Sequence, residues 1–190
     1  GIAAMQLAQL AGAEVYATAG SDAKRAFVTD AGAKHVMNSR DLSWADVIPR
    51  HSDDQGVDVI LNSLPGEAIA KGLGVLRTGG RFLEIGKRDL YAAAPLGLEP
   101  FRNNLAMFAI DLDQLFREQP ERMGTMLRGM VGRFESGQLQ PLPTQNFSAD
   151  ETRDAFRYMQ QGKHIGKVVV DYRGGIEEVF PGEVADVDFK

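Results

Sequence analysis

Residues 57–64 read VDVILNSL, a run of mainly apolar residues that ends in a polar pair and is followed by a Pro-Gly turn. A short apolar run bounded by turn residues is typical of a parallel strand that is buried on both faces. Strands that alternate with helices predict a doubly wound α/β fold, with a parallel sheet covered by helices on both faces. Similar runs lie at residues 15–18, 35–37 and 81–85, and helical stretches begin between them near Ser21, Ser43 and Glu67.

The chain opens on a helical stretch, in which Ala3, Leu7 and Leu10 follow helical spacing. Gly1 and Ala4 fit the last two positions of a G-x-G-x-x-G/A turn, the phosphate-binding turn of Rossmann-type folds. We therefore expect that the strand and first glycine of this turn precede residue 1, and that Gly1 contacts a dinucleotide. The alternative is a small residue that packs a helix against a sheet.

The pattern changes after residue 85. An irregular stretch at 87–104 leads to a strand at 105–110, and a long helix follows Pro120, with an apolar stripe that we interpret as core packing. An extended segment, a helix at 149–161 and a strand at 167–170 come next. We expect a Rossmann-type domain over residues 1–140, a returning segment over 141–172 that packs on a substrate-covering domain outside this chain, and a linker over 173–190.

Composition excludes several classes of protein. Hydrophobic residues make up 44% and charged residues 25%, and no apolar run is long enough to span a membrane. The net charge of −5 argues against a general nucleic-acid surface. The chain has no cysteine, and its three histidines lack ligand spacing, so we expect no metal site. The lack of cysteine also fits a cytoplasmic protein.

The end of the second predicted strand favours NADP over NAD. NAD-binding proteins place an acid here for the ribose hydroxyls, whereas this chain has Ser21, with Lys24 and Arg25 in the first helical turn. A 2′-phosphate would be attracted by the two cations and hydrogen-bonded by the hydroxyl. Ser39 and Arg40, after the third strand, could add to the same pocket. The alternatives are a solvated helix face and a simple turn.

Four strings resemble the enoyl reductase domains of modular polyketide synthases and animal fatty acid synthase, which are zinc-independent medium-chain reductases related to quinone oxidoreductase. They lie at residues 57–64, 79–89, 101–105 and 164–170, and the resemblance extends from Gly1 to about Tyr172. In this family NADPH delivers a hydride to the β carbon of a trans-2-enoyl thioester carried on an acyl carrier protein, and a proton reaches the α carbon.

The resemblance also implies site residues. Lys87 matches the family's lysine after the fifth strand, and Asp113 matches its nearby acid, so these are the candidate proton donor or oxyanion stabiliser and its partner. The alternatives are a capping or phosphate-contacting role for Lys87 and a helix N-cap role for Asp113. Further nucleotide contacts are expected at the strand ends, from Asn62, Ser63, Leu64, Ile85, Gly86 and Lys167.

The resemblance further implies partners: other synthase domains in the same polypeptide, and a second copy that pairs through the edge strand at 105–110. Because the substrate-covering domain is expected to lie outside this chain, we expect the 190 residues to bind cofactor without catalysing the reaction alone. Two alternatives remain at this point, a free-standing quinone or alkenal reductase and a nucleotide-binding module without catalytic activity.

Overall fold

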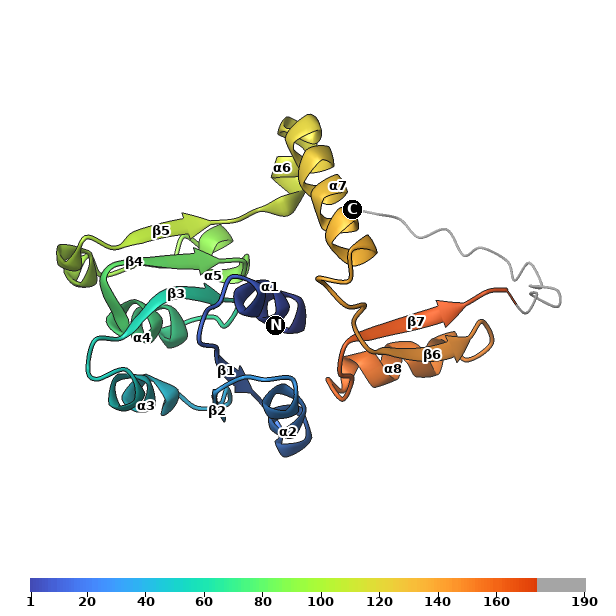
Figure 1. Ribbon diagram of the computed structural model, residues 1–190, viewed down its shortest axis with the longest axis horizontal. Helices are drawn as coiled ribbons and strands as arrows, with labels where there is room; N and C mark the ends of the chain where they lie inside the picture. Colours follow the sequence, from blue (N-terminus) through green and yellow to red (C-terminus); the bar gives the residue numbers. More distant parts are fainter. Residues whose placement is uncertain (174–190) are drawn as a thin grey trace. The chain divides into compact units, whose positions relative to one another are not determined.

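The computed structural model describes residues 1–173, which form two compact units divided after Leu139 (Figure 1). The strands of the first unit are β1 (Tyr16–Ala19), β2 (His35–Asn38), β3 (Val57–Asn62), β4 (Leu76–Glu84) and β5 (Ala106–Ala109). Its helices are α1 (Ile2–Leu10), α2 (Asp22–Asp30), α3 (Trp44–His51), α4 (Glu67–Gly74), α5 (Arg88–Tyr91), the 3-10 helix η1 (Glu99–Asn103), α6 (Leu112–Glu118) and α7 (Pro120–Glu135).

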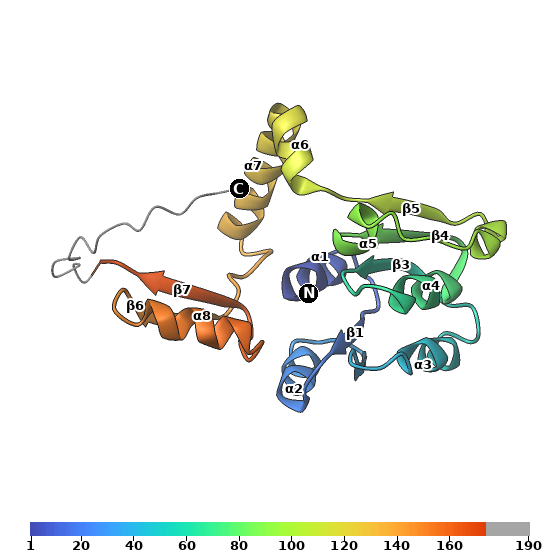
Figure 2. The same ribbon diagram turned by 180° about the vertical axis from the view of Figure 1, so that it is seen from behind.

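The predicted α/β fold with parallel strands is confirmed, but the strands form two sheets rather than one. β1 pairs with β2, and a second sheet has the order β3-β4-β5, with every pair parallel. Figure 2 shows β3, β4 and β5 side by side from the opposite direction. Within residues 1–173, no strand pairs with the second edge of β1 or of β3, which is why the sheet is divided.

One hydrophobic core lies beneath both sheets. Trp44 and Ile48 of α3 pack with Ala68 of α4, and partly buried Tyr16 of β1 and Val57 of β3 contact the same cluster. Helices α3 and α4 lie side by side next to β3 (Figures 1 and 2). A second cluster, centred on the fully buried Phe82 of β4, joins α4 to the larger sheet. These helices therefore connect strands that share no hydrogen bonds.

The opposite face of the larger sheet is less well covered than the sequence predicts. Leu61, Leu83 and Phe108 are in register across β3, β4 and β5. Leu61 is 43% exposed and Phe108 is 50% exposed. The expectation that helices bury both faces is thus wrong for this row, because α3, α4 and η1 all pack on the face that carries Phe82.

Strand β4 begins five residues earlier than the sequence predicts. Its pairing with β3 shifts between Val57, which lies opposite Leu76, and Val59, which lies opposite Arg81. The extra residues include Gly79, whose φ of +76° is a left-handed conformation that favours glycine. The shift lets the strand pair with β3 both before and after the bulge.

The apolar stripe of the long helix α7 is less buried than the sequence predicts. Met123 is buried, but Met126, Leu127 and Val131 are each more than half exposed, so most of the stripe lies outside the core formed by the described residues. Helix α7 packs against α6, a separate helix that ends just before Pro120. None of the helices in residues 1–173 is long and apolar enough to cross a membrane.

The second unit, from residue 140 onward, contains β6 (Thr144–Ser148), α8 (Thr152–Gln160) and β7 (Lys167–Asp171). Strands β6 and β7 are parallel, and α8 packs on both. Gly166 precedes β7 with a φ of +82°, and a Cβ atom there would lie 2.0 Å from the carbonyl oxygen of Pro143, so only glycine fits. The predicted linker, apart from its first residue, lies outside the described residues.

Candidate functional site

The carboxyl end of β1 carries the predicted phosphate-binding residues. Ser21 is the N-cap of α2, and its hydroxyl accepts a hydrogen bond from the backbone N–H of Lys24 at 3.4 Å. Arg25 folds back over the strand end, where Nη1 donates to the carbonyl of Ala19 at 3.1 Å and Nη2 forms an ion pair with Asp22. Arg25 lies at the predicted strand end, and the structure adds an ion pair with Asp22 that the sequence did not indicate.

Arg40, which follows β2, lies across Gly20, which follows β1. The ends of these two strands therefore meet here. The backbone N–H of Ser39 donates to the carbonyl of Ala19 at 3.2 Å, which holds the two strand ends together. A Cβ atom built on Gly20 would lie 2.6 Å from Nε of Arg40. Gly20 thus lies in the candidate site, where the sequence analysis did not include it, and its signal is a small residue where a strand enters a helix.

The ends of β3 and β4 are joined by a buried pair. Asn62 and Glu84 lie opposite each other in the strand register and are 7% and 1% exposed. The amide of Asn62 donates to Oε2 of Glu84 at 2.5 Å and to the carbonyl of Leu64 at 2.8 Å, so both amide hydrogens have internal partners. Oε1 of Glu84 accepts from the backbone N–H of Gly86 at 2.6 Å. The predicted nucleotide contact from Asn62 remains untested.

Lys87 follows this segment and is held by two carboxylates. Its Nζ lies 2.9 Å from Oδ1 of Asp111 and is also hydrogen-bonded to Asp113. Oδ2 of Asp111 accepts from the hydroxyl of Tyr91 at 2.7 Å. The structure therefore brings together the predicted pair of Lys87 and Asp113, and adds two residues that the sequence analysis missed.

Asp111 is the better buried of the two acids, with a side chain 21% exposed compared with 74% for Asp113. Oδ1 of Asp111 also accepts from the backbone N–H groups of Asp113 and Gln114, which makes Asp111 the N-cap of α6. The N-cap role considered for Asp113 therefore belongs to Asp111. An Asp two residues before the predicted one, at a helix start, was the available sequence signal.

The charges in this cluster favour the ionised forms. Hydrogen bonds to Asp113 and Asp111 raise the pKa of Lys87 well above its usual range. Hydrogen bonds from Lys87 and Tyr91 hold the pKa of Asp111 well below its usual range, and Asp111 in turn raises the pKa of Tyr91. Lys87 is thus an ammonium group across the neutral pH range. Of its three N–H donors, two are used by the carboxylates of the described residues.

The remaining predicted nucleotide contacts are spread along the chain. Gly1 is the N-cap of α1, and Ser63 and Ile85 are exposed just past the ends of β3 and β4. Leu64 packs against the hydrophobic core with its side chain partly buried. Lys167 begins β7 in the second unit. Their contacts with a nucleotide remain predictions.

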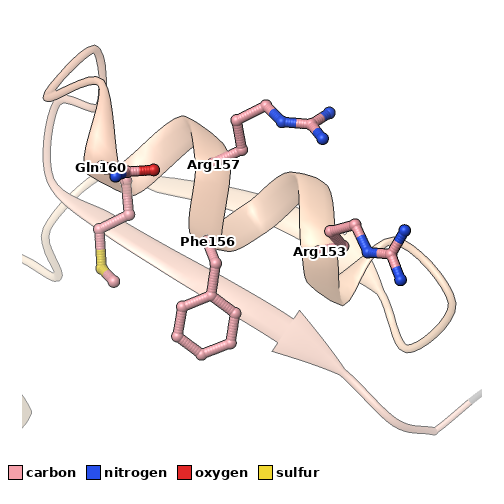
Figure 3. A pocket seen from close by; sticks show the side chains of 5 residues that line it. Arg153, Phe156, Arg157 and Gln160 are labelled. Carbon is pink, nitrogen blue, oxygen red and sulfur yellow. The ribbon is translucent and has the colours of Figure 1, made fainter.

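A shallow hollow on α8 of the second unit contains none of the predicted site residues. It is lined by Arg153, Phe156, Arg157, Met159 and Gln160. Figure 3 shows Phe156 and Arg157 projecting from opposite sides of the helix, so these side chains do not converge on one point. We assign no ligand to this hollow.

Comparison with known proteins shows which family the chain belongs to. Residues 31–170 match the family model described as zinc-binding dehydrogenase. The chain is 43% identical over 181 residues to one of the phenolphthiocerol/phthiocerol polyketide synthase subunits of Mycobacterium tuberculosis, and this match covers 94% of the chain and 8% of that protein. It is 42% identical over 190 residues to a mycocerosic acid synthase-like polyketide synthase of Mycolicibacterium smegmatis, and this match covers 98% of the chain and 9% of that protein.

Two crystal structures are also similar. The CurK enoyl reductase superposes with a TM-score of 0.76 at 42% identity, over 88% of this chain and 50% of that one. The nucleotide-binding subdomain of the enoylreductase domain of PpsC from Mycobacterium tuberculosis superposes with a TM-score of 0.70 at 43% identity, over 74% of this chain and 78% of that one.

The chain therefore belongs to the zinc-binding dehydrogenase family. Within that family it belongs with the enoyl reductase domains of polyketide synthases, and its α/β unit corresponds to their nucleotide-binding subdomain. The curated relatives are large multidomain synthases, of which the chain spans only about 8%.

The residues present do not fit the zinc ion in the family's description. The chain has no cysteine, and residues 1–173 contain no group of three His, Cys, Asp or Glu side chains that could hold a metal ion. His35 and His51 do approach each other, with ring centroids 4.4 Å apart, but His35 is engaged by Glu14.

Proposed function

We propose that these residues form the NADPH-binding part of an enoyl reductase, one domain of a longer synthase that reduces a trans-2-enoyl thioester on an acyl carrier protein. The observation that carries the proposal is Lys87, an ammonium held by two carboxylates just beyond the end of β4. Parallel α/β folds bind their ligands outside the carboxyl ends of the strands. The 190 residues would bind the nucleotide, and reduction would need further parts of the polypeptide.

The choice of NADPH over NADH is supported by the end of β1. An acid at this position would repel a 2′-phosphate, whereas this chain has Ser21, and the guanidinium of Arg40 lies across the preceding Gly20. Arg25 and Lys24 add positive charge on the first turn of α2. The residues present therefore fit the cofactor.

Bound NADPH would supply the hydride that adds to the β carbon of the substrate. Negative charge then develops on the thioester oxygen, and the third N–H of Lys87 is available to stabilise it. Two carboxylates hold the ammonium of Lys87, so we assign it electrostatic stabilisation of this charge, and a proton from Lys87 or from another donor in the longer polypeptide then reaches the α carbon to complete the reduction. Asp111 and Asp113 hold the ammonium in place before the charge develops.

Two measurements test the proposal. Fluorescence titration of the chain should show tighter binding of NADPH than of NADH, and Lys24→Ala and Arg25→Ala should weaken only NADPH binding. In the natural polypeptide that contains these residues, Lys87→Ala should lower kcat by roughly 100- to 1000-fold with little change in the Kd of NADPH. Unchanged turnover in Lys87→Ala would rule out its catalytic role.

We also propose that two copies pair through β5. It is an edge strand of the three-stranded sheet, with its second side unpaired among residues 1–173. An exposed apolar edge such as Ala106–Ala109 favours association with another strand.

A further inference from the structure

The end of β4 carries a buried carboxylate, Glu84, which directly follows the apolar residues Phe82 and Leu83. Glu84 is 1% exposed and lies on the same face of the sheet as Phe82, which is fully buried. A buried carboxylate is costly unless its oxygens are hydrogen-bonded. Glu84 meets this condition with one partner for each oxygen, Asn62 on β3 and the backbone of Gly86. Both partners lie beside the segments that reach the candidate site.

These bonds link two loops. Asn62 closes the turn after β3, because its Oδ1 accepts from the N–H of Leu64 at 3.1 Å while its amide donates to the carbonyl of the same residue. Glu84 closes the turn after β4 through Gly86, which directly precedes Lys87. The bond between the Asn62 and Glu84 side chains joins the two turns into one hydrogen-bonded chain.

The same two loops are tied again at the surface. The backbone N–H of Gly66 donates to Oδ2 of Asp89 at 3.0 Å. Between the two ties, Gly86 lies next to Ser63, and a Cβ atom built on Gly86 would be in van der Waals contact with the carbonyl oxygen of Ser63 at 3.4 Å. One buried contact and one surface contact therefore position the backbone that carries Lys87 relative to the turn after β3.

We infer that Asn62 and Glu84 are positioning residues that set the place of Lys87 relative to the turn after β3. The inference rests on the proposed function, since it assigns these residues an effect on turnover that acts through Lys87. Neither side chain needs to touch substrate, because the donors of Asn62 and both oxygens of Glu84 have protein partners. Loss of their hydrogen bond should let the ammonium move, and displacements of about 1 Å can cost roughly 100-fold in rate.

The test is a double-mutant cycle on kcat in the natural polypeptide that contains these residues, with Glu84→Gln, Lys87→Ala and both together. Glu84→Gln keeps the size of the side chain but places an amide against the amide of Asn62. We expect kcat to fall at least about tenfold in Glu84→Gln and to be no lower in the double variant than in Lys87→Ala. If too little Glu84→Gln folds, Asn62→Ser takes its place in the same cycle.

Two further variants separate positioning from general stability. Asp58→Asn removes the Asp58–Arg77 ion pair, which ties the same two strands near their other ends, and should leave kcat unchanged. Asn62→Asp combined with Glu84→Gln exchanges donor and acceptor, and should recover part of the lost kcat. Circular dichroism would establish that each protein is folded at the assay temperature.

The outcomes distinguish the two proposals. If Lys87→Ala retains full turnover, the proposed role of Lys87 fails. If Lys87→Ala is slow but the effect of Glu84→Gln adds to it in full, only the positioning role is wrong. A loss of thermal stability in Glu84→Gln with unchanged kcat would likewise leave Glu84 as a structural residue.

Discussion

Gly20→Ala should remove most of the preference for NADPH, so that NADPH and NADH bind with similar Kd values. The added methyl group would lie 2.6 Å from Nε and 3.1 Å from Cζ of Arg40, so the end of the Arg40 side chain must shift, and we expect this shift to take the guanidinium away from a 2′-phosphate at the end of β1. A hydrogen bond to a charged group contributes about 1.5–3 kcal/mol, which corresponds to roughly a 10- to 150-fold weaker Kd for NADPH. NADH lacks the 2′-phosphate and should bind as before.

The assay is fluorescence titration of both coenzymes with the wild-type chain, Gly20→Ala, Arg40→Ala and the double variant. If the methyl group acts only by displacing Arg40, the double variant should bind NADPH no more weakly than Arg40→Ala does. Gly129→Ala is the matched control, because a Cβ atom at Gly129 meets nothing within 4 Å. Equal weakening of NADPH and NADH would show that the change disturbs the fold, and unchanged NADPH binding would refute the role of Arg40.

Two further predictions concern acids. Asp22→Asn should tighten NADPH binding about two- to fivefold at low ionic strength, because it releases Arg25 from its ion pair, and added salt should reduce the gain. Asp111→Asn should lower the Tm at neutral pH. Since the pKa of Asp111 is lowered in the folded state, the wild-type advantage is complete above the unfolded pKa of about 3.9 and is lost as the pH falls through the folded pKa. Thermal melts across that range would check this, and a growing advantage on acidification would contradict it.

Sequence reasoning succeeded where local chemistry decides the structure. Ser21 begins α2 as an N-cap, and the alternation of strands and helices gave the α/β class, because both depend on neighbours in the chain. Lys87 and Asp113 were paired through family resemblance, and the structure places them in contact. The position of Arg40 over Gly20 could not be read in the same way, since it depends on how two strand ends meet.

The sequence analysis missed Asp111 and Glu84 for the same physical reason. Asp111 and Asp113 are both plausible acids by spacing, and only the three-dimensional contacts show that Asp111 caps α6 while it binds Lys87 and Tyr91. Glu84 lies in a run that the apolar pattern predicts to be a strand, and an acid on the same face as Phe82 is itself a signal of a buried hydrogen-bonded pair. A polar side chain can be buried in a core only where hydrogen-bonding partners meet it. Such partners can lie far away in the sequence, as Asn62 does from Glu84.

In the 190-residue chain by itself, the division of the described strands into two sheets has a consequence for hydrogen exchange. The sheet of β1 and β2 has two strands of four residues each, which is too small to be stable without the helices that cover it. Its amides should therefore exchange at a lower opening free energy than those of β3, β4 and β5. A ligand that contacts both Arg40 and Lys87 would join the two sheets into one cooperative unit. Slower exchange in β1 and β2 would then report binding at the distant end of β4, without any change in the average structure.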